Sequence, residues 1–249
     1  MKKIYEKSEL RFAIIWIVIY CVLQSLAIPI DEAIGVEYSA SAVSCVMQAV
    51  LLFFFIWKNN LSERYGLCKA SVSARKLLYY VPLIVLASEN LWYGVTLNKY
   101  SLAGTVCHVV CMLCVGFVEE VIFRGFLFKA MAKNNLKSAV IVSSVTFGIG
   151  HLVNLFNGSG MDLVNNLCQV ICAVAFGFLF VTIFYYSGSL LPCIVTHSAI
   201  NTLSTFANEA ALTAEKLIIY TILTTVLSVA YILFLTKTLP KNQPQNPLL

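Results

Sequence analysis

Charge is scarce in this chain of 249 residues, because Asp, Glu, Lys and Arg together make up 12% of it against 59% hydrophobic residues. The mean hydropathy is +0.83. Soluble globular domains carry about 25% charged residues, so the composition excludes an ordinary soluble domain. Internal repeats of about 20 to 50 residues are also missing. The net charge of +5 needs no nucleic-acid partner to explain it.

Long apolar runs take the place of the missing charge. Each is close to the ~20 residues that a helix rising ~1.5 Å per residue needs to cross a hydrocarbon core ~30 Å thick. Short connections join these runs, so the sequence predicts an all-α protein that forms one integral membrane domain over residues 1–249. The eight predicted transmembrane helices are residues 12–30, 40–57, 77–95, 102–130, 139–156, 163–186, 190–206 and 217–235.

Positive charge is distributed unevenly between the loops that join these spans. Cytoplasmic loops retain Lys and Arg, and eight spans place all of the 17 basic residues except Lys99 and Lys216 on one side. We therefore expect a multi-pass protein of the cell membrane with both termini in the cytoplasm and the lipid bilayer around it. An alternative remains for the first span, because Ser25-Leu26-Ala27 follows a basic and apolar stretch as in a cleavable signal peptide.

The stretch GFVEEVIFRG, residues 116–125, places three charges inside an apolar span. A charge at membrane depth costs about 3 kcal/mol even on insertion scales, so it usually faces a protein interior or a water-filled cavity. Glu120 and Arg124 are four residues apart and share a helical face, whereas Glu119 points about 100° away. We predict that Arg124 neutralises Glu120, that the two carboxylates have separate environments, and that Glu119 stays free to act. A purely structural ion pair is the alternative.

Histidine is scarce as well, and two of the three histidines lie in later spans with a partner four residues away. Phe147 and His151 share a face in the fifth predicted span, and His197 and Asn201 share one in the seventh. Each pair alone also fits interhelical packing and hydrogen bonding. The joint occurrence of the pairs with the carboxylates is what favours a site.

Depth in the membrane is compatible with such a site. At ~1.5 Å per residue, His151 lies ~20 Å and His197 ~10 Å from the cytoplasmic starts of their spans, and Glu119 lies ~15 to 20 Å in. Helix tilt and boundary shifts absorb differences of this size. We therefore expect these groups to meet in a polar cavity in the cytoplasmic half of the bilayer.

The ordered set Glu119-Glu120-x-x-x-Arg124, Phe147-x-x-x-His151 and His197-x-x-x-Asn201 resembles the motifs of the CPBP family of intramembrane proteases. This family is also called the CAAX protease and bacteriocin-processing, or Abi, family. The motif-bearing core covers about residues 100–206, and the first three predicted spans carry no motif.

The resemblance implies a membrane-embedded endopeptidase that cuts peptides near the cytoplasmic face. In such an enzyme Glu119 would be the general base that activates water, and His151 would help to hold that water. Glu120 and Arg124 would support the base. Amide hydrolysis needs a base of this kind within reach of water.

The resemblance also implies that His197 and Asn201 stabilise the oxyanion, a task that needs hydrogen-bond donors aimed at the developing negative charge. Glu119, His151 and His197 are a plausible Zn²⁺ set as well. The sequence has no HExxH motif, and Asn201 suits an oxyanion better than zinc. We therefore favour a glutamate mechanism without a cofactor and keep Zn²⁺ as the alternative.

Two functions of different class follow from the resemblance. The first is proteolysis of a peptide or protein substrate, such as a prenylated CAAX-type tail, a bacteriocin-type precursor or another membrane-proximal peptide. The second is a non-catalytic role in bacteriocin self-immunity or peptide binding. A small-solute transporter would show inverted repeats and broken helices, which the sequence lacks.

Overall fold

The computed structural model describes residues 1–70 and 80–239, and within these residues the chain is helical apart from turns and one isolated β-bridge between Val95 and Ala207. Helices labelled η are of the 3₁₀ type, except for η3, which is a π-helix. The elements in chain order are α1 Lys2–Lys7, α2 Glu9–Ile34, α3 Ser39–Lys58, α4 Val81–Ala87, η2 Glu89–Leu91, α5 Leu102–Glu120, η3 Val121–Phe128, α6 Lys129–Ala132, α7 Leu136–Gly150, η4 His151–Leu155, α8 Leu163–Ser187, α9 Leu191–Leu203, η5 Ser204–Phe206, η6 Glu209–Ala211 and α10 Ala214–Thr238.

Six helical segments in the described part of the chain are long and apolar enough to cross a membrane. They correspond to six of the eight predicted spans, each at nearly the expected position. α5, η3 and α6 run without a break as one segment of 31 residues. The six are Glu9–Ile34, Ser39–Lys58, Leu102–Ala132, Leu136–Leu155, Leu163–Ser187 and Ala214–Thr238.

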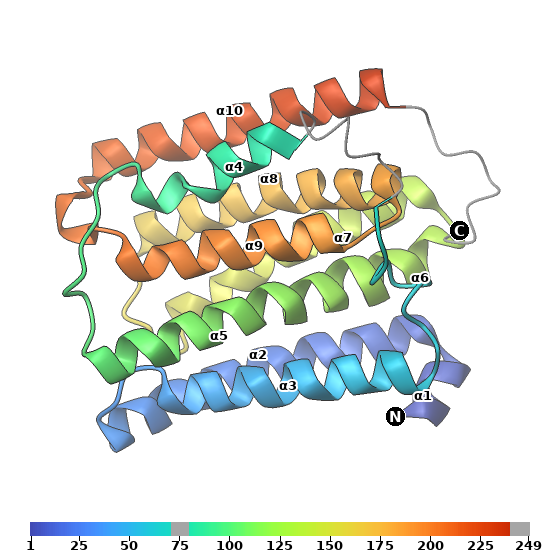
Figure 1. The fold of residues 1–249 in the computed structure, drawn as a ribbon, viewed down its shortest axis with the longest axis horizontal. Helices are drawn as coiled ribbons and strands as arrows, with labels where there is room; N and C mark the ends of the chain where they lie inside the picture. The colour runs from blue at the N-terminus through green and yellow to red at the C-terminus, as the bar shows by residue number, and fades with distance from the viewer. Residues whose placement is uncertain (71–79, 240–249) are drawn as a thin grey trace.

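The remaining two predicted spans are shorter than expected. α9 has 13 residues, about 20 Å of helix, because it continues into the tighter 3₁₀ turn η5 rather than as an α-helix. Of the predicted span 77–95, residues 77–79 lie outside the described residues, and α4 covers only seven of the others. Both helices still run along the bundle in the direction that alternation requires (Figure 1). The total of eight spans stays a prediction.

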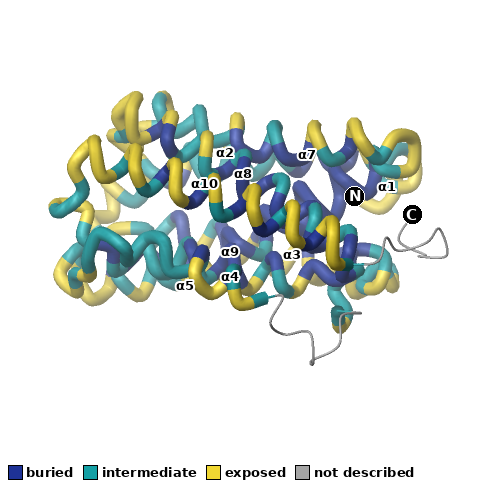
Figure 2. Tube along the Cα trace, turned by 90° about the horizontal axis from the view of Figure 1, so that it is seen from above, coloured by how far each residue is buried: buried dark blue, intermediate teal, exposed yellow. Residues whose placement is uncertain are grey.

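The helices lie side by side along one axis, with α2 and α3 at one edge of the bundle and α10 at the opposite edge (Figure 1). In the most apolar window of each span, 56% of the residues are buried in the segments 102–132 and 163–187, against 22% in α2 and in α10. α5–α6 and α8 are therefore the centre, and Figure 2 shows the exposed positions along the outer faces of the bundle. Exposed leucines, isoleucines and valines on those faces suit contact with lipid.

Both ends of the described chain, α1 and the end of α10, lie at the same end of the bundle (Figure 1). Two ion pairs of Glu9 connect α2 to neighbouring loops at this end. Its Oε1 lies 2.5 Å from Nη2 of Arg64, and its Oε2 lies 2.7 Å from Nζ of Lys133. Six candidate spans and eight predicted spans are both even in number, which agrees with termini on one side, and their placement in the cytoplasm stays a prediction.

Side-chain caps fix where several helices begin. Ser101 accepts a hydrogen bond from a backbone N–H in the first turn of α5, and Asn135, Asp162 and Thr213 do the same for α7, α8 and α10. Such caps satisfy N–H groups that have no partner within the helix.

Candidate active site

Glu119 and Glu120 are the last two residues of α5, and the helix continues from them into the π-helix η3. Every residue of η3 is buried, including Arg124. π-Helical segments inside α-helices are rare and frequent at functional sites. Ser143 of α7 supports this one, because its hydroxyl donates a 2.8 Å hydrogen bond to the backbone carbonyl of Phe123.

Arg124 and Glu120 form a fully buried ion pair, with both side chains 0% exposed and Nη1 3.1 Å from Oε1. The guanidinium lies 4.0 Å from the ring centroid of Phe147 and 5.5 Å from that of Phe180. Its nitrogens make no hydrogen bond of regular geometry to any residue in the described ranges. Stacking and charge therefore hold Arg124 in place, and a lysine would lack the planar group that stacks.

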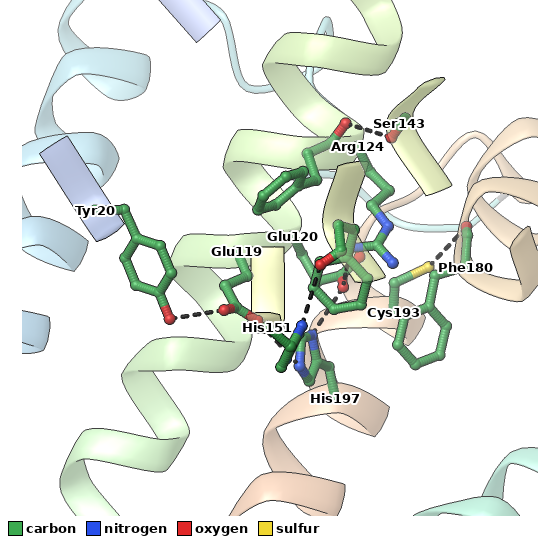
Figure 3. A network of polar contacts seen from close by, with 11 residues as sticks. Tyr20, Glu119, Glu120, Arg124, Ser143, His151, Phe180, Cys193 and His197 are labelled. Carbon is green, nitrogen blue, oxygen red and sulfur yellow. Dashed lines mark hydrogen bonds and ion pairs between the residues drawn. The ribbon is translucent and has the colours of Figure 1, made fainter. Parts of the chain in front are cut away.

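His197 of α9 contacts both carboxylates. Its Nδ1 lies 2.8 Å from Oε1 of Glu120, and its Nε2 lies 3.4 Å from Oε2 of Glu119. Figure 3 shows the ring between the ends of the two acids. The prediction of separate environments is therefore wrong: the Cβ directions differ, but long side chains from one helical turn can converge on a residue of another helix.

Tyr20 of α2 completes the surroundings of Glu119, because its hydroxyl donates a 2.7 Å hydrogen bond to Oε1 (Figure 3). The sequence reasoning missed this residue. A usable signal was present: Phe12 and Trp16 are apolar and Tyr20 follows them at the same four-residue spacing, which places a hydroxyl on the inward face of the span.

His151 begins the 3₁₀ turn η4 directly after α7 and is half-buried. Its Nδ1 lies 3.1 Å from the backbone carbonyl of Phe147, and its ring packs edge-on against the Phe147 ring at 5.3 Å. The ring of His197 packs against the same phenylalanine at 5.6 Å. Phe147 thus brings the two histidines to one region, although neither His151 nitrogen contacts Glu119 directly.

The fully buried Asn166 of α8 holds the backbone at His151, since its Nδ2 donates a 2.8 Å hydrogen bond to the His151 carbonyl. This contact lies where α7 ends and the carbonyl has lost its helical partner. Sequence reasoning did not single out Asn166.

Asn201 lies one turn after His197 on α9 and is half-buried. Its side chain makes no hydrogen bond within the described parts of the chain, so its amide N–H groups are available. The end of α9 is fixed from outside, because the Asn90 side chain in η2 donates a 2.9 Å hydrogen bond to the carbonyl of Ile200.

Two glycines, on α5 and α7, let these helices approach their neighbours α9 and α8 closely. A Cβ at Gly116 of α5 would lie 2.6 Å from the backbone nitrogen of Ser198 in α9, next to His197. A Cβ at Gly148 of α7 would lie 2.8 Å from the backbone nitrogen of Val174 in α8. Contacts this short do not occur, so only glycine permits these helix–helix distances.

The fit of a metal ion can be judged from the side chains themselves. Within residues 1–70 and 80–239, no group of three His, Cys, Asp or Glu side chains lies close enough together to hold a metal. The alternative zinc set of Glu119, His151 and His197 is therefore not assembled as a ligand group in this arrangement. The glutamate mechanism stays a prediction.

Comparison with protein-family models matches residues 101–203 to the family described as Type II CAAX prenyl endopeptidase Rce1-like. Residues 101–203 form an Rce1-like domain of the CPBP family. Comparisons with curated proteins and with solved structures gave no match. The Rce1-like domain contains all three motifs, whereas α2, with Tyr20, precedes it. The family and the six apolar helices together indicate a multi-pass membrane protein with protease activity.

Proposed function

We propose that this protein is an intramembrane endopeptidase in which Glu119 activates the water that hydrolyses a peptide bond. The observation that carries the proposal is the contact of Glu119 with His197, deep in the bundle and linked through that histidine to a second, neutralised carboxylate. Burying Glu119, Glu120 and Arg124 together costs free energy, and such buried ionisable groups are typical of sites where a proton is transferred.

The division of labour between the acids follows from their contacts. Glu120 lies at 0% exposure against Arg124 and His197, so it has no access to a water nucleophile. Glu119 is 6% exposed, and its carboxylate faces His197 on one side and Tyr20 on the other. In the proposed reaction Glu119 takes a proton from water while the oxygen attacks the carbonyl carbon, and it later passes that proton to the leaving amine.

Oxyanion stabilisation falls to Asn201 and His197 in this proposal. The Asn201 amide carries N–H donors that nothing in the described chain engages. The Nδ1 of His197 lies 2.8 Å from Oε1 of Glu120, so an N–H at Nε2 would be the donor that this ring offers to the oxyanion. The 3.4 Å contact of Nε2 with Glu119 is looser than the 2.8 Å contact of Nδ1, so Nε2 is the nitrogen that can turn to the substrate.

The substrate class that we propose is a prenylated peptide of the CAAX type, which rests on the name of the matching family. His151 would help to hold the attacking water beside Glu119. A bacteriocin-type precursor is the other peptide to assay, because the family resemblance covers such substrates too.

The decisive experiment is peptide cleavage by purified protein in vesicles, with wild type, Glu119→Gln and His151→Ala. Removing the base should lower kcat by about 10²-fold or more, within the range of general base catalysis. Glu209→Gln, which changes an exposed carboxylate paired with Lys99, is the matched control and should keep full activity. Unchanged turnover in Glu119→Gln would refute the protease, and self-immunity preserved in that variant would support the binding function instead.

Metal dependence is tested in the same assay by chelation. Turnover that persists after exhaustive chelation supports the glutamate mechanism. Loss that only zinc restores would overturn it in favour of a metalloprotease.

A further inference from the structure

Tyr20 lies outside the Rce1-like domain, on the first long helix of the chain, yet its hydroxyl contacts the carboxylate that we propose as the base. The two residues are 99 positions apart, and the O–H donates to Oε1 of Glu119 over 2.7 Å. Hydrogen bonds to an ionised acceptor are the short and strong ones. No other residue of α2 makes a hydrogen bond or ion pair with the described residues of the site.

Buried aromatic residues on the face of α2 that carries Tyr20 hold this helix against the site. Phe12 and Trp16, two turns and one turn earlier on α2, are 2% and 1% exposed. The Phe12 ring lies 5.1 Å from that of Phe126 in η3, the segment that directly follows Glu120. α2 is thus held against the π-helix, and the same stripe of side chains carries Tyr20 to Glu119.

The stripe changes character as it reaches the depth of the site. Its first two members are apolar and its last two are polar: Tyr20 donates to Glu119, and Gln24 donates to the sulfur of Cys45 over 3.2 Å. Packing alone would be served by apolar residues at both positions. The hydroxyl of Tyr20 makes its one hydrogen bond to a buried carboxylate, which points to a role in fixing the orientation of that carboxylate.

We propose that Tyr20 is a positioning residue for Glu119, which makes α2 part of the active site. Oε1 accepts a 2.7 Å hydrogen bond from Tyr20 of α2, whereas Oε2 lies 3.4 Å from Nε2 of His197, so the phenol is the shorter polar contact of this carboxylate. This restricts rotation of a side chain that would otherwise lose its reactive orientation. Positional errors of about 1 Å at a reacting group can cost 10²-fold in rate. The inference rests on the proposed role of Glu119.

Tyr20→Phe removes only the hydroxyl, so it isolates this contact. We expect kcat to fall at least about tenfold, with KM unchanged within about twofold, because the variant disturbs the base and not substrate binding. Tyr231→Phe is the matched control, since the Tyr231 hydroxyl is buried and has no hydrogen-bond partner among the described residues. It should leave kcat and KM at wild-type values.

Two further variants separate positioning from general support of the fold. 4-Aminophenylalanine at position 20 keeps an N–H donor at the same place and should restore kcat to within about threefold of wild type. In a Glu119→Asp background the shorter acid no longer reaches the phenol, so Tyr20→Phe should lower kcat by less than about twofold.

The outcomes distinguish this inference from the proposed function. Abolished turnover in Glu119→Gln together with wild-type kinetics in Tyr20→Phe overturns the role of Tyr20 alone. The role of Tyr20 is also overturned if Tyr20→Phe lowers kcat equally in the wild-type and Glu119→Asp backgrounds. The same holds if 4-aminophenylalanine at position 20 does not restore kcat. Unchanged turnover in Glu119→Gln overturns the proposed function and this inference together.

Discussion

The contact between α5 and α9 at Gly116 sets how far the carboxylates lie from His197, so a single methyl group there should disable the enzyme. In Gly116→Ala the new Cβ would meet Ser198 at 2.3 Å from Oγ, 2.6 Å from the backbone nitrogen and 2.7 Å from Cα. The hydroxyl can rotate away, but the two backbone atoms cannot. Non-bonded heavy atoms sit about 3.5 to 4.0 Å apart, so the helices must separate by about 1 Å.

The magnitude follows from that displacement. Overpacking a tight contact costs about 1 to 3 kcal/mol, which the better helix propensity of alanine offsets by about 1 kcal/mol. For a chain of this size, 1 kcal/mol shifts Tm by about 2 to 4 °C, so we expect a fall of a few degrees. Activity should suffer more, by about 10²-fold in kcat, because Glu119 and His197 lie within one turn of the displaced residues.

Gly125→Ala is the matched control on the same continuous helix. A Cβ at Gly125 would meet its nearest neighbour, a ring atom of Tyr65, at 3.7 Å, which is an ordinary contact. The two variants are compared for Tm and for peptide turnover in vesicles. Equal activity of Gly116→Ala and Gly125→Ala, both near wild type, would refute the claim that the α5–α9 distance controls the site.

Two further pairs of variants test the α7–α8 side of the site. Gly148→Ala would bring a Cβ within 2.8 Å of a backbone nitrogen in α8, whereas Gly150→Ala would meet nothing within 4 Å; we expect lower Tm and at least about tenfold lower kcat in the first only. Asn166→Ala removes the hydrogen bond to the His151 carbonyl and should cost about 1 kcal/mol in unfolding free energy and lower kcat. Asn165→Ala removes an exposed amide that donates to Asp162, so it should leave kcat unchanged and lower Tm less than Asn166→Ala does. Equal losses of kcat in the two asparagine variants would contradict the role of the bond to His151.

The parts of the fold and site that depend on one helix could be predicted from the sequence. Apolar run length identified six spans at nearly their observed positions, and four-residue spacing predicted the contact of Glu120 with Arg124. Both are local properties that follow from helix geometry. The π-helix that follows Glu120 was not predicted, because an apolar run with four-residue spacing gives no sign of a change from α- to π-helical hydrogen bonding.

The parts that depend on how helices meet could not be predicted. The contact of His197 with both acids requires the depth and rotation of α9 against α5, which the close approach at Gly116 sets. The four-residue spacing of Tyr20 with Phe12 and Trp16 could have placed it on an inward face, but that spacing does not show which helix the face meets. The short length of α9 reflects a 3₁₀ turn, and apolar composition does not distinguish that turn from a longer α-helix.

The linked contacts also explain why the site has two acids but one arginine. Arg124 stacks on Phe147 and pairs with Glu120, and Glu120 in turn holds Nδ1 of His197. His197 is therefore oriented by a buried acid that never needs to meet substrate, and its other nitrogen is left toward Glu119. In the proposed reaction the two acids that flank this imidazole divide the work: Glu120 holds the ring, and Glu119 takes the proton from water. Loss of Arg124 should thus disable Glu119 through two intermediates, although the two side chains make no direct contact.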